Sequence, residues 1–81
     1  MFHVLILDSR LKSREEILFE GQAESVLLPG EEGEFEILDF HKPIISTLKK
    51  GIIAVDNIKE FPVEGGVAKM YQQKLVAIVD T

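Results

Sequence analysis

Two histidines and the carboxylate that precedes the second of them are the first residues that could do chemistry. His3 and His41 are the only histidines, and Asp39 stands two residues before His41. Imidazole nitrogens and carboxylate oxygens are common zinc ligands, so these three side chains would form a metal site if the fold brought His3 to the other two. Two distant histidines and one acid are a weak pattern. His41, beside Pro43 in an irregular stretch, fits exposure or a hydrogen bond to a backbone carbonyl better, and the sequence predicts no metal and no cofactor.

Clustered glutamates are the second group with chemical potential. Glu34 and Glu36 are two residues apart, which would place them on one face of a strand. Glycoside-cleaving enzymes use two carboxyl groups about 5–9 Å apart across a cleft. Glu31, Glu32 and Glu34 suggest calcium, but the spacing of an EF-hand is absent. A small β domain offers little cleft, so we expect these acids to be a solvated surface.

No other spacing indicates catalysis. The four serines are in no nucleophile-elbow context, and no glycine-rich segment has the spacing of a phosphate-binding loop. The chain contains no cysteine, which excludes a thiol nucleophile and a disulfide framework. No enzymatic activity therefore stands out from these patterns.

The charge pattern indicates the kind of partner. The formal net charge is −5, which disfavours nucleic acid because phosphates select basic surfaces. Nine acids and no Lys or Arg lie between Glu15 and Asp39, whereas six lysines and four acids follow from Lys42 onward. One acidic edge could thus meet a basic partner. No apolar run approaches the ~20 residues of a membrane helix, and no signal peptide is apparent, so we expect a soluble intracellular protein without direct membrane insertion.

The elements that must position these residues are short strands. At 81 residues the chain has room for one domain, spanning residues 1–81. Turn signals separate short apolar runs that recur about every ten residues. These runs are Val4–Leu7, Ile17–Phe19, Val26–Leu28, Ile52–Val55, Val67–Tyr71 and Leu75–Val79. The pattern predicts an all-β fold, a two-sheet sandwich or flattened barrel of about eight to ten short strands.

Local patterns refine this expectation. Alternation in Gly33–Ile37 predicts a strand with Phe35 and Ile37 inward. The segment Arg10–Phe19 is the nearest to a helical pattern and is kept as a helical alternative. Gly65-Gly66 is expected to allow a positive φ between two strands.

Several predicted strands are apolar on both faces. They include Leu5–Leu7, Val26–Leu28, Ile52–Val55 and Val76–Val79. Either the sheets curl enough to hide both faces near their ends, or a partner covers an outer face. The sequence leaves both explanations open.

The order of features from Ser25 to Gly51 is specific. These features are Ser25–Gly30, Glu32–Phe35, Ile37-Leu38, His41, Pro43, Leu48-Lys49 and Gly51. In this order they resemble the N-terminal β-sandwich domain of the epsilon subunit of F-type ATP synthases. Phe2–Leu7, Gly65-Gly66 and Val76–Asp80 resemble its first strand, its glycine pair and its last strand, so the resemblance covers essentially the whole chain.

The resemblance implies a non-catalytic central-stalk subunit of a proton-translocating rotary ATP synthase. It implies that Glu31, Glu34 and His41 lie toward the ring of c subunits, whose polar loops carry arginine. It also implies that Ile44, Ile45 and Ser46 approach the gamma subunit. The expected location is peripheral, on the cytoplasmic side of the bacterial inner membrane.

Some residues depart from the family pattern. Glu36 stands where a glycine is usual, and Asp39-Phe40 stands where proline-glycine is usual. The sequence stops at Thr81, before the helical hairpin that normally follows, so we expect a short form without the hairpin's inhibitory or ATP-binding properties. The alternative to the stalk role is a stand-alone β-sandwich module for protein interaction or ligand binding.

Overall fold

A computed structural model of the chain describes residues 1–10 and 17–81. Within those residues all regular structure is strand, and no helix is present that could span a membrane. The strands are β1 (Phe2–Asp8), β2 (Ile17–Ala23), β3 (Ser25–Gly30), β4 (Gly33–Leu38), β5 (Ile44–Leu48), β6 (Gly51–Val55), β7 (Lys59–Val63), β8 (Gly65–Tyr71) and β9 (Lys74–Asp80). The expected all-β fold, a sandwich or flattened barrel of about eight to ten short strands, is confirmed.

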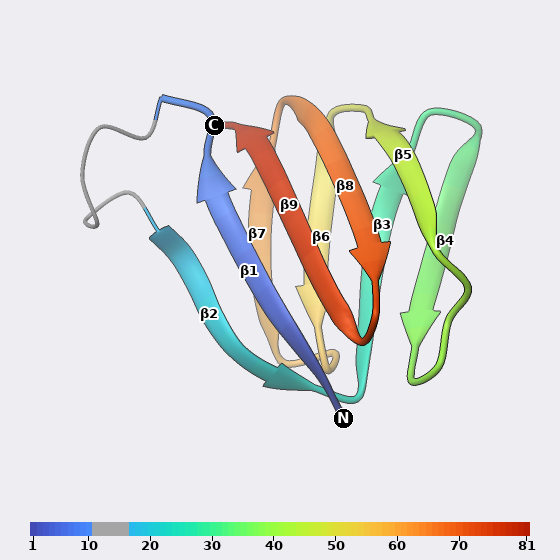
Figure 1. Cartoon of the computed structure of the whole chain (residues 1–81). Helices are drawn as coiled ribbons and strands as arrows, with labels where there is room; N and C mark the ends of the chain where they lie inside the picture. The colour runs from blue at the N-terminus through green and yellow to red at the C-terminus, as the bar shows by residue number, and fades with distance from the viewer. Residues whose placement is uncertain (11–16) are drawn as a thin grey trace.

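The strands form two layers that share one corner. Hydrogen bonds connect them in the order β2-β1-β9-β8-β5-β3-β6-β7, with β4 paired to the other side of β3. In Figure 1 the strands β1, β9 and β8 lie in front of β7, β6 and β3. At the corner, β5 meets β3 through the single pair Gly30–Leu48. The path therefore folds over at β3, and the two layers face each other as a sandwich.

The core lies between the layers. In β1 every second residue is buried, from Phe2 to Asp8, as the alternation of side chains across a strand requires. The largest fully buried side chains come from both layers: Phe2, Ile6, Leu28, Ile37, Ile53, Met70 and Leu75. The predicted alternation in β4 is present, because Ile37 is buried, Phe35 is half-buried and the glutamates are exposed.

The structure differs from the sequence-based expectation in three places. Strand β7 was not expected. The glycine pair does not separate two strands, because β8 begins at Gly65 and Glu64 alone separates it from β7. Of the helical alternative at 10–19, residues 11–16 lie outside the described residues, and the remaining apolar part belongs to β2.

One side of the sandwich is closed by aromatic side chains. The rings of Phe19 in β2 and Phe61 in β7 have centroids 5.8 Å apart, and Lys59 Nζ lies 5.3 Å from the centroid of Phe19. A cation over an aromatic face is attracted to it. These contacts join the edge strands of the two layers on that side.

A buried carboxylate joins the end of β1 to the end of β9. Asp8 accepts hydrogen bonds from the backbone N–H and guanidinium of Arg10 and from Thr81 Oγ1 at 2.8–3.2 Å. Hydrogen bonds from Arg10, and then from Thr81, hold the pKa of Asp8 well below its ordinary value. Because β1 and β9 pair in parallel, these contacts secure the end of that pairing.

We expect Asp8→Asn to lower the stability of the chain at neutral pH. The pKa of Asp8 is lower in the folded state, so its contribution is present above the ordinary carboxyl pKa of about 3.9 and declines as the pH falls below it. Urea unfolding across this pH range should show a difference between wild type and variant that shrinks in acid. Exposed Glu60→Gln is the control. A difference that does not depend on pH would contradict the assignment.

We expect Gly66→Ala to destabilise the fold more than Gly33→Ala. Both glycines have positive φ, +150° at Gly66 and +135° at Gly33, but a Cβ at Gly66 would clash with the Ile78 carbonyl oxygen, whereas at Gly33 it meets nothing within 4 Å. The strain alone costs about 1 kcal/mol at each site, and the clash adds roughly 1–3 kcal/mol at Gly66. Equal unfolding midpoints in urea would contradict this close approach.

Candidate functional site

An acidic hairpin occupies one end of the sandwich. Glu31 and Glu32 form the turn between β3 and β4, and Glu34 follows on β4. All three glutamates are exposed, and no ion pair joins them to any residue that the structure describes. The Glu31 backbone N–H donates to the Thr47 carbonyl at 3.1 Å, which holds the turn against β5. We name this region the acidic hairpin.

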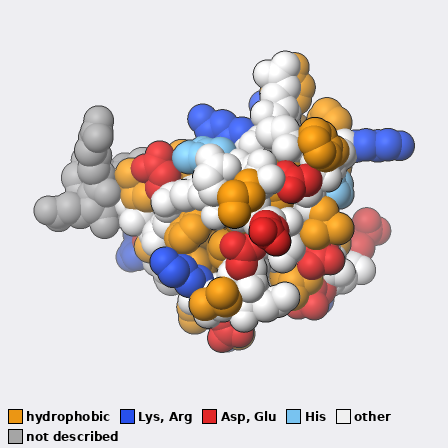
Figure 2. Space-filling model, turned by 90° about the horizontal axis from the view of Figure 1, so that it is seen from below, with side chains coloured by type: hydrophobic (Ala, Val, Ile, Leu, Met, Phe, Trp, Pro, Cys, Tyr) orange, Lys and Arg blue, Asp and Glu red, His pale blue; other side chains and the backbone are white. Residues whose placement is uncertain are grey.

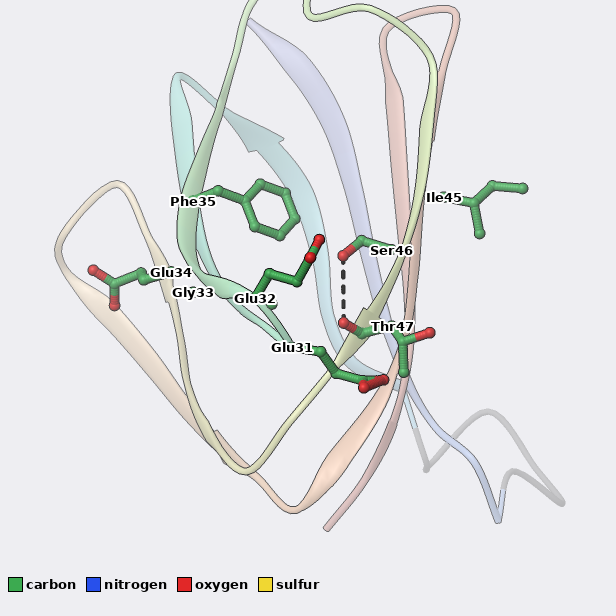
Figure 3. A pocket seen from close by; sticks show the side chains of 9 residues that line it. Glu31, Glu32, Gly33, Glu34, Phe35, Ile45, Ser46 and Thr47 are labelled. Carbon is green, nitrogen blue, oxygen red and sulfur yellow. Dashed lines mark hydrogen bonds between the residues drawn. The ribbon is translucent and has the colours of Figure 1, made fainter.

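A groove runs between β4 and β5 beside this turn. It has a volume of about 570 Å³. Figure 3 shows Phe35 and Glu32 pointing into the groove, whereas Glu34 and Ile45 point away from it. The Phe35 ring lies over Gly30, where a Cβ atom would come within 2.8 Å of it. The groove therefore has an aromatic wall and a carboxylate inside it.

The predicted residues for c-ring contact do not all lie together. Glu31 and Glu34 share the acidic hairpin. His41 lies in the loop that follows the opposite end of β4, and this strand has six residues. At about 3.3 Å per residue, the length of β4 is close to 20 Å. His41 Nδ1 donates to the Lys42 carbonyl at 2.8 Å, in agreement with the expected backbone contact.

The predicted residues for gamma contact lie on different faces of β5. Ile45 is 74% exposed and points outward, whereas Ile44 is half-buried and packs against the core. Ser46 lines the groove, and its Oγ donates to the Thr47 carbonyl at 3.3 Å. Of these three residues, Ile45 offers the outward apolar surface.

The outward face of Ile45 continues across the sheet only diagonally, because its direct partner on β8 is Lys69, whereas Val67 stands opposite Thr47. Val67 on β8 and Ile78 on β9 are direct partners and are each about half exposed, at 47% and 48%. Ile78 is in turn paired with the half-buried Leu7 on β1. We name Leu7, Ile45, Val67 and Ile78 the apolar outer face.

The opposite end of the sandwich holds a strained aromatic residue. Phe40 has φ of 61° and is 86% exposed. Its N–H donates to Gln73 Oε1 at 2.7 Å, and Gln73 Nε2 donates to Asp39 Oδ1 at 3.2 Å. The Met1 ammonium lies 2.7 Å from Asp39 Oδ2, and this hydrogen bond, followed by that of Gln73, lowers the pKa of Asp39. Figure 2 looks at this end and shows hydrophobic and acidic side chains side by side.

The residues considered for metal binding and for acid–base catalysis do not form such sites in the described part of the chain. His3 Nε2 lies 3.7 Å from a Glu20 carboxylate oxygen on the neighbouring strand. Across residues 1–10 and 17–81, no three histidine or carboxylate side chains gather so that they could hold a metal ion. Glu34 and Glu36 are both exposed on β4, and Glu34 points away from the groove.

Sequence reasoning missed Phe35 and Thr47 as parts of the groove, and Phe40 as an exposed side chain. Phe35 was expected only to face the core. The position of Phe40 carried a signal, because Asp39-Phe40 stands where the resembled family usually has proline-glycine. A position that suits glycine often has positive φ, which is the conformation observed here.

Comparisons with known proteins agree on one family. Residues 7–81 match the family described as "ATP synthase, Delta/Epsilon chain, beta-sandwich domain". The ATP synthase epsilon chain of Parvibaculum lavamentivorans is 37% identical over 78 residues, which are 91% of this chain and 59% of that protein. The epsilon chain of Leptospira interrogans is 35% identical over 71 residues, 84% of this chain and 56% of that protein. The chain thus spans less than two thirds of the length of these relatives.

Two solved structures share the fold. One is the central stalk and c-ring of the Tetrahymena thermophila mitochondrial ATP synthase, with a TM-score of 0.74 and 14% identity, covering 98% of this chain and 63% of the other. The second is the OSCP/F1/c-ring part of the Euglena gracilis mitochondrial ATP synthase, with a TM-score of 0.76 and 16% identity, covering 100% and 52%.

We expect Phe40→Gly to stabilise the isolated chain. Glycine removes the strain of a positive φ, and the exposed ring contributes little burial. The net gain is about 0.5–1 kcal/mol, because glycine also enlarges the entropy of the unfolded chain. Chemical unfolding measures it, with Ile58→Gly as the control, since Ile58 is 81% exposed without a positive φ. A destabilised Phe40→Gly would show that the ring makes a stabilising contact.

Proposed function

The chain belongs to the family of ATP synthase delta/epsilon-chain β-sandwich domains, and from this membership we propose that it is a non-catalytic subunit of the central stalk of a proton-translocating F-type ATP synthase. In this role residues 1–81 link the gamma subunit to the c-ring, so that proton flow is coupled to ATP synthesis at other subunits. The relatives named above are bacterial epsilon chains, which supports a peripheral position on the cytoplasmic face of the inner membrane.

The acidic hairpin is the observation that carries the c-ring contact. Glu31 and Glu34 are exposed at one end of the sandwich, without an ion pair in the described part of the chain. A cationic loop of the c-ring can form charge-assisted hydrogen bonds with them. Lys50 also lies near this end, where its Nζ is 3.9 Å from a Glu64 carboxylate oxygen. Both side chains of that pair are largely exposed, so it contributes little.

His41 belongs to the proposal as a separate contact. The length of β4 separates it from the acidic hairpin, so one loop of a c subunit does not reach both. His41 lies at the end of the sandwich where Phe40 is exposed. A contact there needs a different part of the partner complex from the one that meets the acidic hairpin.

The apolar outer face supports the contact with gamma. Ile45, Val67 and Ile78 expose large apolar side chains across three adjacent strands. Val67 and Ile78 are paired directly, and Ile45 lies diagonal to Val67 with Lys69 opposite it. Exposed apolar residues that are grouped and bordered by polar ones are typical of protein interaction surfaces. We assign Ile45, with Ile44 beneath it and Ser46 beside it, to the edge of this contact.

The double charge reversal Glu31→Lys with Glu34→Lys should release the c-ring while the gamma subunit stays bound. Like charges would then face the cationic loop, and we expect affinity for the purified c-ring to fall at least about tenfold, which corresponds to about 1.4 kcal/mol. Pull-down from gently solubilised membranes, with all retained subunits identified, measures both contacts.

Glu60→Lys on β7 is the matched control, since it reverses an exposed charge at another edge strand. Retention of the c-ring by the double reversal would contradict the contact at the acidic hairpin. If the folded wild-type chain retains no synthase subunit, the stalk role itself is wrong, and a stand-alone interaction module is the better explanation.

A further inference from the structure

The two long sides of the sandwich differ in how their edge strands are covered. On one side, the contact between Phe19 and Phe61 joins β2 to β7. On the other side, β4 and β5 are edge strands of different layers with the groove between them (Figure 3). An uncovered strand edge is a template for pairing with another chain. The side with β4 is therefore where this fold can accept a strand.

The backbone of β4 has one side without a partner strand. Within the described residues β4 pairs only with β3. Pro29 stands opposite Glu34, it has no N–H, and its carbonyl accepts from the Lys49 N–H at 2.8 Å on the far side of β3. Glu34 therefore belongs to a non-hydrogen-bonded pair, and by the alternation of antiparallel strands so does Glu36. Both residues direct their N–H and C=O groups away from β3.

The side chains of β4 present different chemistry to the two faces of an added strand. Glu34 and Glu36 are exposed on the outer face, and Phe35 borders the groove on the inner face. In an antiparallel pair, residues directly opposite each other have side chains on the same face and interact. An added strand would thus place every second side chain beside a glutamate and the others beside Phe35.

We propose that the free edge of β4 binds an extended segment of a protein partner that alternates basic and apolar side chains, and that this segment adds to the sheet as an antiparallel strand. Its basic side chains pair with Glu34 and Glu36, and an apolar side chain packs against Phe35 at the groove. Main-chain hydrogen bonds supply affinity and the alternating side chains supply specificity.

The other edge strand of the same layer does not offer this site. In β7, Pro62 stands opposite Ile52 and has no N–H to donate. That strand also faces β2 through Phe61. Proline and a covering neighbour are two of the common protections of an edge, and β4 has neither. Its exposed glutamates repel another acidic edge but attract a basic strand.

The test uses the isolated chain with a capped octapeptide that alternates lysine and valine, so its outcome depends on neither gamma nor the c-ring. Amide hydrogen exchange followed by NMR should show that saturating peptide slows Glu34 and Glu36 at least about tenfold. The amides of Phe35 and Ile37, which already face β3, should change little, as should the Glu60 amide on β7.

Methylated peptides distinguish binding through main-chain hydrogen bonds to β4 from binding through charge attraction alone. N-methylation of the lysines removes the N–H groups that face β4 and should abolish binding, whereas N-methylation of the valines, whose N–H groups face away, should not. The chain variant Glu34→Lys with Glu36→Lys should lose binding, with Glu60→Lys as its control. Equal binding of both methylated peptides, binding without protection of Glu34 and Glu36, or no binding of the parent peptide would each overturn the proposal.

Discussion

The architecture depends on β3 belonging to both layers at once. Along one edge it pairs with β4, while the other edge is shared between β6 and the end of β5. Pro29 fits this division, because its carbonyl points away from β4 and accepts from the Lys49 N–H, and the side of β3 on which it lacks an N–H is the one where β6 gives way to β5. The acidic hairpin is held in place by the same corner, through the bond between Glu31 and Thr47. The backbone hydrogen bonds that join β3 to β5 at the corner therefore also position the acidic hairpin.

The strands that are apolar on both faces have two different explanations in the structure. In β6, Ile53, Ala54 and Val55 are consecutive and all buried, so curvature of the sandwich hides both faces at that end. In β9, Ile78 lies between two buried residues and is about half exposed. Curvature thus accounts for β6, whereas the outer face of β9 remains open in the chain alone, as the proposed contact with gamma requires.

Much of the fold could be predicted because short apolar runs and turn residues mark most strands, and because the order of features from Ser25 to Gly51 resembles one family. Strand β7 could not, since Lys59-Glu60-Phe61-Pro62-Val63 mixes charge and proline in a way that only an edge strand tolerates. The separation of His41 from Glu31 follows from the strand that alternation predicted over Gly33–Ile37, because that strand lies between the two residues. The family resemblance, which assigned both residues to one contact, did not take this strand into account. The groove depends on which layer each edge strand joins, which is a tertiary property.

The parallel pairing of the first strand with the last has a consequence for synthesis on the ribosome. Hairpins such as β3–β4 join neighbours in sequence and can form as soon as they emerge. The layer that contains β1 cannot close until β9 has left the exit tunnel, because β9 lies between β1 and β8. Until then β1 can pair with β2 along one edge, but its other edge is bare. Chaperone contact during translation would therefore be concentrated on β1, and a ribosome stalled before Leu75 would carry a domain in which the layer of β1 is incomplete and one strand edge is open to aggregation.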